Sequence, residues 1–460
     1  MPDRGPQVKK TKITPQKGAA GSARQTALEV LHQLFQHPED GTPLPVMLAR
    51  ASQAAGLSAR DAALLSELVY GVLRRHALLD SLLAAFLRKP GALSSQVGMT
   101  LRLGLYELLF MDSIPARATV SEYVALARRR FGQGVGGLVN GVLRSADREA
   151  DVLREKAAQA APAEAASIPA WLMSLWEAQF GTEAAAGFAS NTLAHAAPCW
   201  RVNMAKDGAA AFRDERLASG YAAVGREGFT SFGLEKPRED AQQELSDLAR
   251  LEEQGVLSRQ GVSSQLVAEH IAARVLQHPA LREAPLWDSC CGRGGKSLAL
   301  LEKGVRVSLA SDPAQFRVDE LLASARRLGL TAPETVCAPA QDVDAEFPLI
   351  LIDVPCSGTG TLGRVPELRL RLTPEKLNEA ERLQGEILEH AWACLQPGGL
   401  LFYVTCALNR KENEGRIARF LAVHGEEKGG EARLCEQRLF LPELPGHDAL
   451  FLAVLEKLAR

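Results

Sequence analysis

The sequence predicts an α/β protein, in which a largely parallel, doubly wound sheet follows a small α+β module and an all-α domain. Three observations predict this order. Apolar residues recur at helical spacing through residues 23–148, short mixed elements fill 169–283, and strands alternate with helices from 284 to 460. At 460 residues the chain is long enough to form more than one hydrophobic core.

The first 168 residues are expected to hold a basic arm, a helical domain and a linker. Residues 1–22 form a disordered arm, because residues 1–24 contain six Lys or Arg against one acidic residue. An alternative is that this tail is only a solvated end without function. Residues 23–148 form an all-α domain, in which Pro and Gly separate short helices. Residues 149–168, rich in Ala, Glu and Gln, form the linker.

The remaining residues are expected to form the small α+β module, 169–283, and the doubly wound domain, 284–460. The module combines an aromatic-bearing helix with further short helices and strands. In the second domain, strands that alternate with helices favour a parallel sheet. Its expected strands are 286–290, 305–311, 334–338, 349–354, 400–405 and 450–455. In such sheets, ligands bind outside the carboxyl ends of the strands.

Composition and charge exclude several classes of protein. The sequence has no uncharged apolar run of about 18 residues and no secretion leader, so a cytoplasmic protein without membrane association is expected. Its eight cysteines include no C-x-x-C pair and no zinc-finger spacing, so free thiols and no metal are expected. A net charge of −2 gives no global indication of nucleic-acid binding. A monomer is the simplest expectation.

A glycine-rich segment, D-S-C-C-G-R-G-G-K at 288–296, follows an expected strand and opens a helix. Its glycines let the backbone turn sharply, and the free N–H groups of the helix start face a ligand there. Asp312 ends the next strand, where a carboxylate could accept hydrogen bonds from ribose hydroxyls. The pattern indicates an adenosine-containing cofactor, but a glycine loop alone would also suit an NAD enzyme or a structural turn.

Two further strands end in motifs that contain cysteine. L-I-L-I-D-V-P-C-S-G-T-G at 349–360 places Asp353 at a strand end and Cys356 on a tight loop, and the other strand ends in Thr405-Cys406. If these strands are neighbours, both thiols lie at one sheet edge beside the cofactor. Carbon 5 of a pyrimidine becomes nucleophilic only after a thiolate adds to carbon 6, so its methylation needs a cysteine, an acid and a base. Cys406, Asp353 and Cys356 could supply that set.

The other cysteines are expected to have structural roles, and one group of arginines is expected to bind RNA. A free cysteine is usually a small buried hydrophobic residue, which is the interpretation for Cys199, Cys337, Cys394 and Cys435. Cys290 and Cys291 are expected to shape the cofactor loop. The arginines expected to contact RNA phosphates follow the Cys356 loop and are Arg364, Arg369 and Arg371.

The motifs resemble those of the NOL/NOP/Sun family of RNA cytosine-5 methyltransferases. The resemblance rests on 288–296, on D-V-P-C-S-G-T-G at 353–360 and on Y-V-T-C-A-L-N-R-K-E-N-E at 403–414. In the helical region, I-P-A-R-A-T-V-S-E-Y-V at 114–124 and G-L-V-N-G-V-L-R at 137–144 are similar to the NusB-like domain of RsmB-type bacterial members. Members usually have C-A-A-P-G-G-K where this chain has C-C-G-R-G-G-K.

The resemblance implies a Rossmann-like class I methyltransferase domain that uses S-adenosylmethionine, behind a NusB-like RNA-binding domain. It implies that Cys406 is the covalent nucleophile, that Cys356 assists product release and that Asp353 contacts N3 of the base. The residues that it implies for cofactor binding are Cys290, Cys291, Gly292, Arg293, Gly294, Gly295, Lys296, Asp312, Asp342 and Asp353. Asp344 or Glu346 could take the place of Asp342.

The expected substrate is a cytosine in RNA. The resemblance of the N-terminal domain to that of RsmB-type members indicates the small-subunit 16S rRNA. A tRNA or another rRNA position is an alternative. A DNA cytosine-5 methyltransferase is disfavoured, because its nucleophile is the cysteine of the P-C motif and it would lack the T-C motif. A non-catalytic RNA-binding or ribosome assembly factor is disfavoured, because both cysteines, Asp353 and the glycine loop are present.

Overall fold

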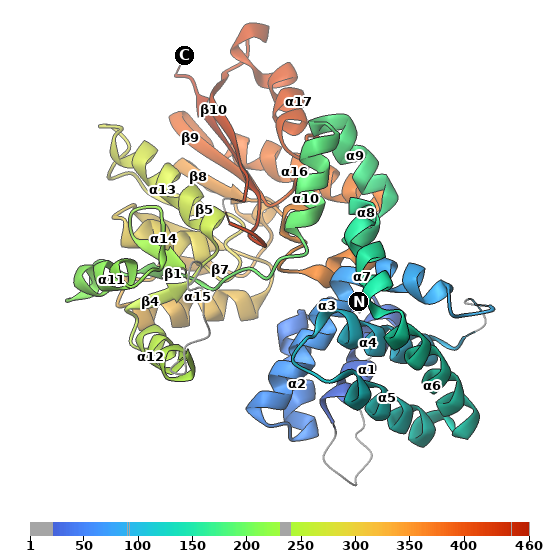
Figure 1. Ribbon diagram of the computed structural model, residues 1–460. Coiled ribbons are helices and arrows are strands. Elements are labelled where there is room, and N and C mark those ends of the chain that lie inside the picture. Colours follow the sequence, from blue (N-terminus) through green and yellow to red (C-terminus); the bar gives the residue numbers. More distant parts are fainter. Residues whose placement is uncertain (1–21, 90, 92, 231–240, 443, 460) are drawn as a thin grey trace, which may run out of the picture. The chain divides into compact units, whose positions relative to one another are not determined.

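The computed structural model describes residues 22–89, 91, 93–230, 241–442 and 444–459 (Figure 1). The expected basic arm, residues 1–22, lies outside these residues except for Ser22. The chain forms two compact units, which divide between Ser167 and Ile168.

The first unit is helical throughout its described residues. Helix α1 begins where the Ser22 side chain accepts a hydrogen bond from the backbone N–H of Gln25, which satisfies one of the free donors of the helix start. The helices are α1 (Ala23–Gln36), α2 (Leu44–Ala55), α3 (Ala59–Ala84), α4 (Ser95–Phe110), α5 (Ala116–Phe131), α6 (Gln133–Arg148), α7 (Ala150–Gln159) and α8 (Pro162–Ala165).

A buried carboxylate joins three of these helices. Glu107 of α4 has no exposed side-chain surface, and its Oε1 lies 2.6 Å from Nη2 of Arg24 in α1. Thr119 and Tyr123 of α5 donate hydrogen bonds to the same carboxylate over 2.7 and 3.1 Å. A buried charge is tolerated when it is both paired and hydrogen-bonded. This group therefore fixes how α1, α4 and α5 meet.

Residues 149–168, expected as a linker, form α7 and α8 and pack within the helical unit. Leu153 of α7 is buried, and the Ser167 hydroxyl accepts a hydrogen bond from the backbone N–H of Ala77 in α3 over 2.9 Å. The helical unit thus continues to Ser167, well beyond residue 148.

The second unit begins with α9 (Ala170–Phe180) and α10 (Thr182–Asn191), followed by a small α+β module. Its antiparallel sheet has the order β2-β3-β1-β4, with a core around Trp200, Phe229 and Leu257, all fully buried. The elements of the module are β1 (Cys199–Val202), α11 (Ala209–Ala218), β2 (Ala222–Val224), β3 (Gly228–Thr230), α12 (Ala241–Glu253) and β4 (Leu257–Arg259).

The larger sheet of this unit has the order β10-β11-β9-β8-β5-β6-β7. The run from β9 to β7 is parallel, whereas β11 is antiparallel to both β9 and β10. Chain order reverses between β5 and β8, which makes the gap between their carboxyl ends the topological switch point. The strands are β5 (Leu286–Asp288), β6 (Val307–Ser311), β7 (Glu334–Val336), β8 (Phe347–Asp353), β9 (Leu395–Thr405), β10 (Ala432–Phe440) and β11 (Leu450–Lys457).

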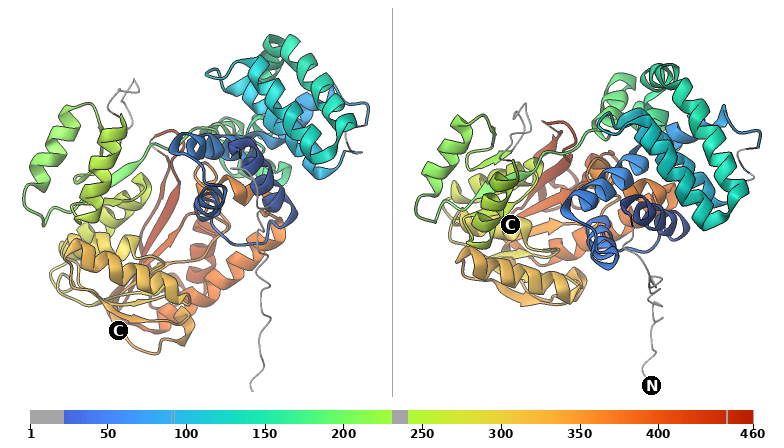
Figure 2. Two further views of the ribbon diagram at one scale, coloured as in Figure 1. Left: turned by 90° about the horizontal axis from the view of Figure 1, so that it is seen from below. Right: turned by 60° about the horizontal axis from the view of Figure 1, so that its bottom comes forward.

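Helices cover both faces of this sheet (Figures 1 and 2). One face buries apolar side chains of α16 and α17 against strand residues, and the other buries those of α13 and α14. Helix α15 packs against α14 through Ala325 and Leu328. These helices are α13 (Val262–Leu276), α14 (Gly295–Glu302), α15 (Gln315–Leu328), α16 (Pro374–Ala393) and α17 (Glu414–His424).

The expected fold class is confirmed, and each expected strand of the larger sheet is present within a few residues. Strand β10 is not anticipated by the sequence pattern. Its side chains alternate poorly between buried and exposed, because it is an edge strand that pairs only with β11.

Trp176 of α9 links the helices that precede the module to the loop after β9. Its side chain is fully buried, and its indole N–H donates to the carbonyl oxygen of Leu408 over 2.7 Å. Trp176→Phe keeps most of the apolar contact but leaves that buried carbonyl without its donor, which costs about 1–3 kcal/mol. We expect a loss of that size in the free energy of unfolding measured by denaturant titration. The half-buried Trp171 provides the control, and an equal loss in Trp171→Phe would contradict this interpretation.

Candidate active site

Three loops meet at one edge of the larger sheet, because three neighbouring parallel strands end there. Strand β5 ends at Asp288, β8 at Asp353 and β9 at Thr405. Asp288 is in register with Leu351, and Asp353 with Val404. The cofactor loop and both cysteine motifs therefore emerge side by side at the switch point.

The two cysteines of these motifs are in contact. Sγ of Cys356 lies 3.0 Å from Sγ of Cys406, although the residues are 50 positions apart in the chain. Both thiols are free and partly exposed. The sequence expectation that the two motifs share one edge is thus met by direct contact of their sulfur atoms.

Backbone bonds and a glycine hold the two cysteine loops together. The N–H of Gly360 donates to the carbonyl of Cys406 over 2.9 Å, and the N–H of Ala449 donates to the carbonyl of Gly360 over 2.9 Å. A Cβ atom at Gly360 would lie 2.7 Å from both the Ala449 and the Cys406 carbonyl oxygens. A side chain would thus collide with backbone, so only glycine allows this close approach.

An ion pair lies beside the thiols. Nζ of Lys296, at the start of α14, is 2.5 Å from Oδ2 of Asp353, and the carboxylate is 32% exposed. Burial alone would lower the pKa of Lys296, but the Asp353 charge and hydrogen bond outweigh burial and raise that pKa above its usual value. Lys296 also interacts electrostatically with Cys406. The ammonium of Lys296 therefore places a positive charge within electrostatic range of Cys406.

The backbone of the cofactor loop, residues 288–296, turns sharply at two glycines. Gly292 and Gly294 have φ angles of +54° and +82°, and a Cβ at Gly294 would lie 2.6 Å from Leu321. The N–H of Gly292 donates to Oδ2 of Asp312 over 3.2 Å, so the loop and the end of β6 are tied together. Burial raises the pKa of the Cys290 thiol to about 12. A thiol with so high a pKa stays protonated near neutral pH.

Two acceptors in this loop retain capacity for an adenosine-containing ligand. Asp312 Oδ1 accepts a hydrogen bond from the N–H of Ala314 over 2.9 Å, and a carboxylate oxygen can accept two. Asp288 Oδ1 is buried and has no hydrogen-bond partner. Gly292 has open space where a Cβ would stand. These features fit the hydroxyl and ammonium donors of S-adenosylmethionine.

Residues 275–456 match the family model described as 16S rRNA methyltransferase RsmB/F, and residues 21–148 match the NusB family. The probable ribosomal RNA small subunit methyltransferase B of Bacillus subtilis is 30% identical, over 95% of this chain and 99% of its own length. The ribosomal RNA small subunit methyltransferase B of Thermus thermophilus is 34% identical, over 88% of this chain and 89% of its own. The chain belongs to the RsmB/F methyltransferase family. It is an RNA methyltransferase with a NusB-like N-terminal domain. The family expected from the sequence is confirmed.

Solved structures share the fold of this RsmB/F-family chain. The crystal structure of PH0851 has a TM-score of 0.69 and 21% identity, and covers 94% of this chain and 98% of that chain. The crystal structure of NSun6 from Pyrococcus horikoshii with SFG has a TM-score of 0.50 and 18% identity, and covers 64% of this chain and 99% of that one. At these identities the likeness shows the fold alone.

The structure shows the burial and contacts of the arginines that were expected to bind RNA, and of Asp342, in this RsmB/F-family chain. Arg369 is a correction, because it is buried and donates to the carbonyls of Leu362 and Thr192, so it holds the loop and is inaccessible to RNA. Arg364 is exposed and paired with Asp448 over 2.7 Å. Arg371 is half-buried, and Asp342 is exposed after β7.

Arg293 stands where most members of the family have proline. Its guanidinium Nε lies 2.9 Å from Oε2 of Glu320 on α15, and both side chains are largely exposed. An ion pair between the loop and a helix can restrict the loop, which a proline does through its fixed φ. Exposed pairs contribute little to stability, so this one orients the loop more than it stabilises the fold.

Sequence reasoning missed the residues that support the cofactor loop from the small module. Arg201 of β1 is buried and pairs with Glu302 at the end of α14, with Nε 2.6 Å from Oε2. It also donates to Gln260, whose Nε2 donates in turn to the carbonyl of Gly295 over 2.9 Å. These contacts join segments far apart in the sequence, so they become visible only in the fold.

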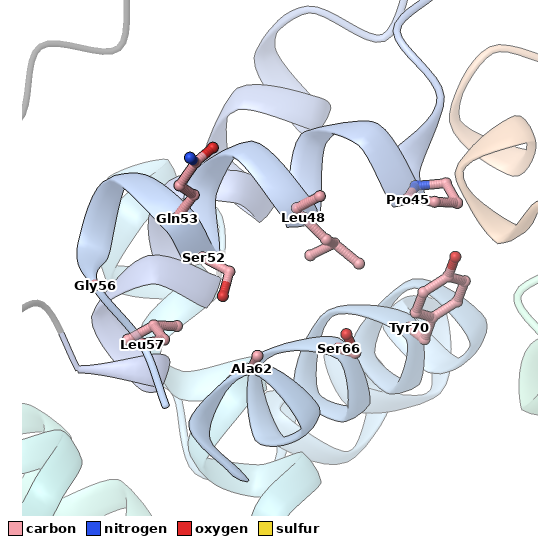
Figure 3. Close-up of a pocket in the computed structure, with 10 residues that line it drawn as sticks. Pro45, Leu48, Ser52, Gln53, Gly56, Leu57, Ala62, Ser66 and Tyr70 are labelled. Atoms are coloured by element: carbon pink, nitrogen blue, oxygen red, sulfur yellow. The ribbon is translucent and has the colours of Figure 1, made fainter. Parts of the chain in front are cut away.

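The helical unit has a groove of its own. A groove of about 500 Å³ lies between α2 and α3, lined by Pro45, Leu48, Ser52, Gln53, Leu57, Ser66, Tyr70 and their neighbours (Figure 3). It carries no charged group and belongs to the helical unit. Across the described ranges, no group of three His, Cys, Asp or Glu side chains could hold a metal ion. No described helix is both long and apolar enough to cross a membrane.

Asp288 provides a pH-dependent test of the cofactor edge. Burial is the main reason that its pKa rises from 3.8 to about 7, against the opposing hydrogen bond from Ser297. Because the folded state holds this proton more tightly than the unfolded state, the stability that it contributes is present below pH 3.8 and is lost as the pH rises through about 7. Asp288→Asn should remove this part of the pH dependence. If denaturant titrations of both proteins give parallel stability curves across that range, Asp288 does not titrate as described.

Proposed function

We propose that this methyltransferase transfers a methyl group from S-adenosylmethionine to carbon 5 of a cytosine in RNA, through a covalent bond between Cys406 and carbon 6. The observation that carries the proposal is the 3.0 Å contact between the Cys356 and Cys406 sulfur atoms, beside the Lys296–Asp353 pair and the glycine loop. The relatives named as ribosomal RNA small subunit methyltransferases B support 16S rRNA as the substrate.

The residues of the loop would hold the cofactor by the groups described above. Asp312 would accept hydrogen bonds from the ribose, and the glycines of 292–295 would let the amino-acid end approach the backbone. When bound, S-adenosylmethionine supplies an electrophilic methyl group. Asp288, Asp312 and the helix start at Gly295 would hold the cofactor beside the strand ends that carry the two cysteines.

The base is activated by addition of a thiolate. The Cys406 sulfur forms a bond to carbon 6, and the electron pair of the C5=C6 bond moves into the ring and makes carbon 5 nucleophilic. Asp353 contacts N3, and the Lys296 ammonium beside it offsets the negative charge that develops on the ring. Carbon 5 can then take the methyl group.

Release reverses the addition. The carbon-5 proton leaves to water, its bonding pair rebuilds the C5=C6 bond, and the C6–S bond breaks with its electron pair returning to Cys406. A thiol in contact with the departing sulfur can donate a hydrogen bond to it and so favour its departure. The 3.0 Å distance between the Cys356 and Cys406 sulfur atoms supports this role for Cys356.

Removing the two thiols separately tests these unequal roles. With 16S rRNA and labelled S-adenosylmethionine, Cys406→Ala should reduce methyl transfer to background, because no sulfur is left to add to carbon 6. Cys356→Ala should accumulate a protein–RNA adduct that survives denaturing electrophoresis, because departure of Cys406 is slowed. Cys337, which the sequence suggests is buried, is exposed in the structure. It gives a control variant, Cys337→Ala, with wild-type activity and no adduct.

The results of these assays distinguish among the possible nucleophiles, target atoms and RNA substrates. An adduct in Cys406→Ala would reverse the roles of the two cysteines. Transfer of label to a nucleoside other than 5-methylcytidine would overturn the target atom. Labelling of tRNA and not of 16S rRNA would overturn the substrate alone.

A further inference from the structure

A buried glutamate lies behind the cysteine pair and has no part in the mechanism so far. Glu412 has no exposed surface, and it follows Cys406 on the same loop. Its carboxylate accepts hydrogen bonds from the backbone N–H of Ser357 over 2.8 Å, from Nε2 of Gln384 over 2.7 Å and from Nδ2 of Asn409 over 2.6 Å. The Ser357 hydroxyl donates a fourth bond.

These donors come from three separate segments around the thiols. Ser357 directly follows Cys356, Gln384 lies on α16, and Asn409 belongs to the loop after β9. Gln384 also donates to the carbonyl of Pro355 over 3.1 Å, and the Tyr403 hydroxyl donates to the carbonyl of Glu412 over 2.7 Å. Glu412 thus joins the Cys356 loop to the Cys406 loop from the buried side.

The polarity of the contacts indicates a carboxylate that carries its negative charge. Three of the four groups are N–H groups, which can only donate, and the Ser357 hydroxyl donates the fourth bond, so the carboxyl oxygens accept in every contact. All four donors are neutral, and among the described side chains no cation forms an ion pair with Glu412. Its charge is therefore uncompensated by an ion pair and acts through a low-dielectric interior on its neighbours.

The charges on the two sides of the thiol pair are opposite. The Glu412 carboxylate accepts two hydrogen bonds from Ser357, the residue next to Cys356, and its charge acts on Cys356. The Lys296 charge acts on Cys406. The hydrogen bond with Cys406 and burial raise the pKa of Cys356 well above its ordinary value, and the charges of Cys406 and Glu412 raise it further. Two thiols in contact share a proton most favourably when it stays on the sulfur nearer the negative charge.

We propose that Glu412 is a positioning residue that keeps the shared proton on Cys356 and so leaves the thiolate to Cys406. The assignment rests on the proposed function, because only a covalent mechanism requires one thiol to attack while the other remains a hydrogen-bond donor. It explains why two adjacent cysteines act differently: the difference arises from the buried charges around them and not from the cysteines themselves.

Thiol labelling in the absence of RNA and S-adenosylmethionine tests the proposal. The full-length protein is treated with limiting iodoacetamide near neutral pH, and peptide mass spectrometry gives the ratio of label on Cys406 to label on Cys356. Exposed Cys337 serves as the internal standard. The wild type should label Cys406 preferentially, because the thiolate is the reactive form. Glu412→Gln removes the charge and should raise the share of Cys356 severalfold.

Two variants separate the charge of Glu412 from its role as a tether. Ser357→Ala removes one hydrogen bond and keeps the charge, so its labelling ratio should match the wild type. Glu379→Gln makes the same chemical change at an exposed position of α16 and should also have no effect. If Ser357→Ala shifts the ratio as much as Glu412→Gln does, or if Glu412→Gln leaves it unchanged, the proposal is overturned.

If Glu412→Gln fails to fold, the same labelling ratio is measured in Lys296→Met. Removing the opposing charge should lower the labelling of Cys406 relative to Cys356, and an unchanged ratio would count against the proposal. Because the labelling uses neither substrate, its failure leaves the proposed methylation intact. Conversely, a protein that labels as expected but transfers no methyl group to any RNA would contradict the proposed function alone.

Discussion

The parallel pairing of β8 with β9 is the constraint on which the rest of the site depends. Asp353 is in register with Val404, and the N–H of Val354 donates to the carbonyl of Val404 over 3.0 Å just beyond the end of β8. A slip of one residue in this register would turn every side chain to the opposite face. The register therefore fixes which side of the sheet edge receives Cys356 and Cys406, and it brings their sulfur atoms into contact.

Buried polar groups then convert that placement into a defined geometry. Glu412 ties the two cysteine loops together from within, and the Arg201–Glu302 pair with Gln260 holds the start of α14 at the neighbouring strand end. Each of these groups is satisfied by several partners, which is the condition for a buried polar network to make a structure more rigid. The two cysteines lie at the sheet edge, whereas the polar groups that hold their loops and α14 lie in the interior.

The sequence predicts the strands and the cysteine motifs well because each depends on local pattern. The run from Leu349 to Ile352 is apolar and the chain breaks at Pro355, so a buried strand with a loop after it follows directly. Arg369 shows the opposite case. Its position in a basic cluster suggests RNA contact, but its burial arises from the carbonyls of Leu362 and Thr192, and Thr192 is 177 residues away. Glu412 lies in a recognised motif, yet its donors become visible only when three distant segments fold together.

The central claim is that Cys406, and not Cys356, forms the bond to the base. The most direct measurement uses wild-type protein, S-adenosylmethionine and 16S rRNA that contains 5-fluorocytidine. Fluorine on carbon 5 cannot leave as a proton does, so elimination is blocked and the adduct accumulates. After protease and nuclease digestion, mass spectrometry should find the methylated nucleotide on the peptide that contains Cys406. A nucleotide attached to Cys356, or methylation of unsubstituted 16S rRNA without any trapped adduct on the fluorinated RNA, would contradict the account.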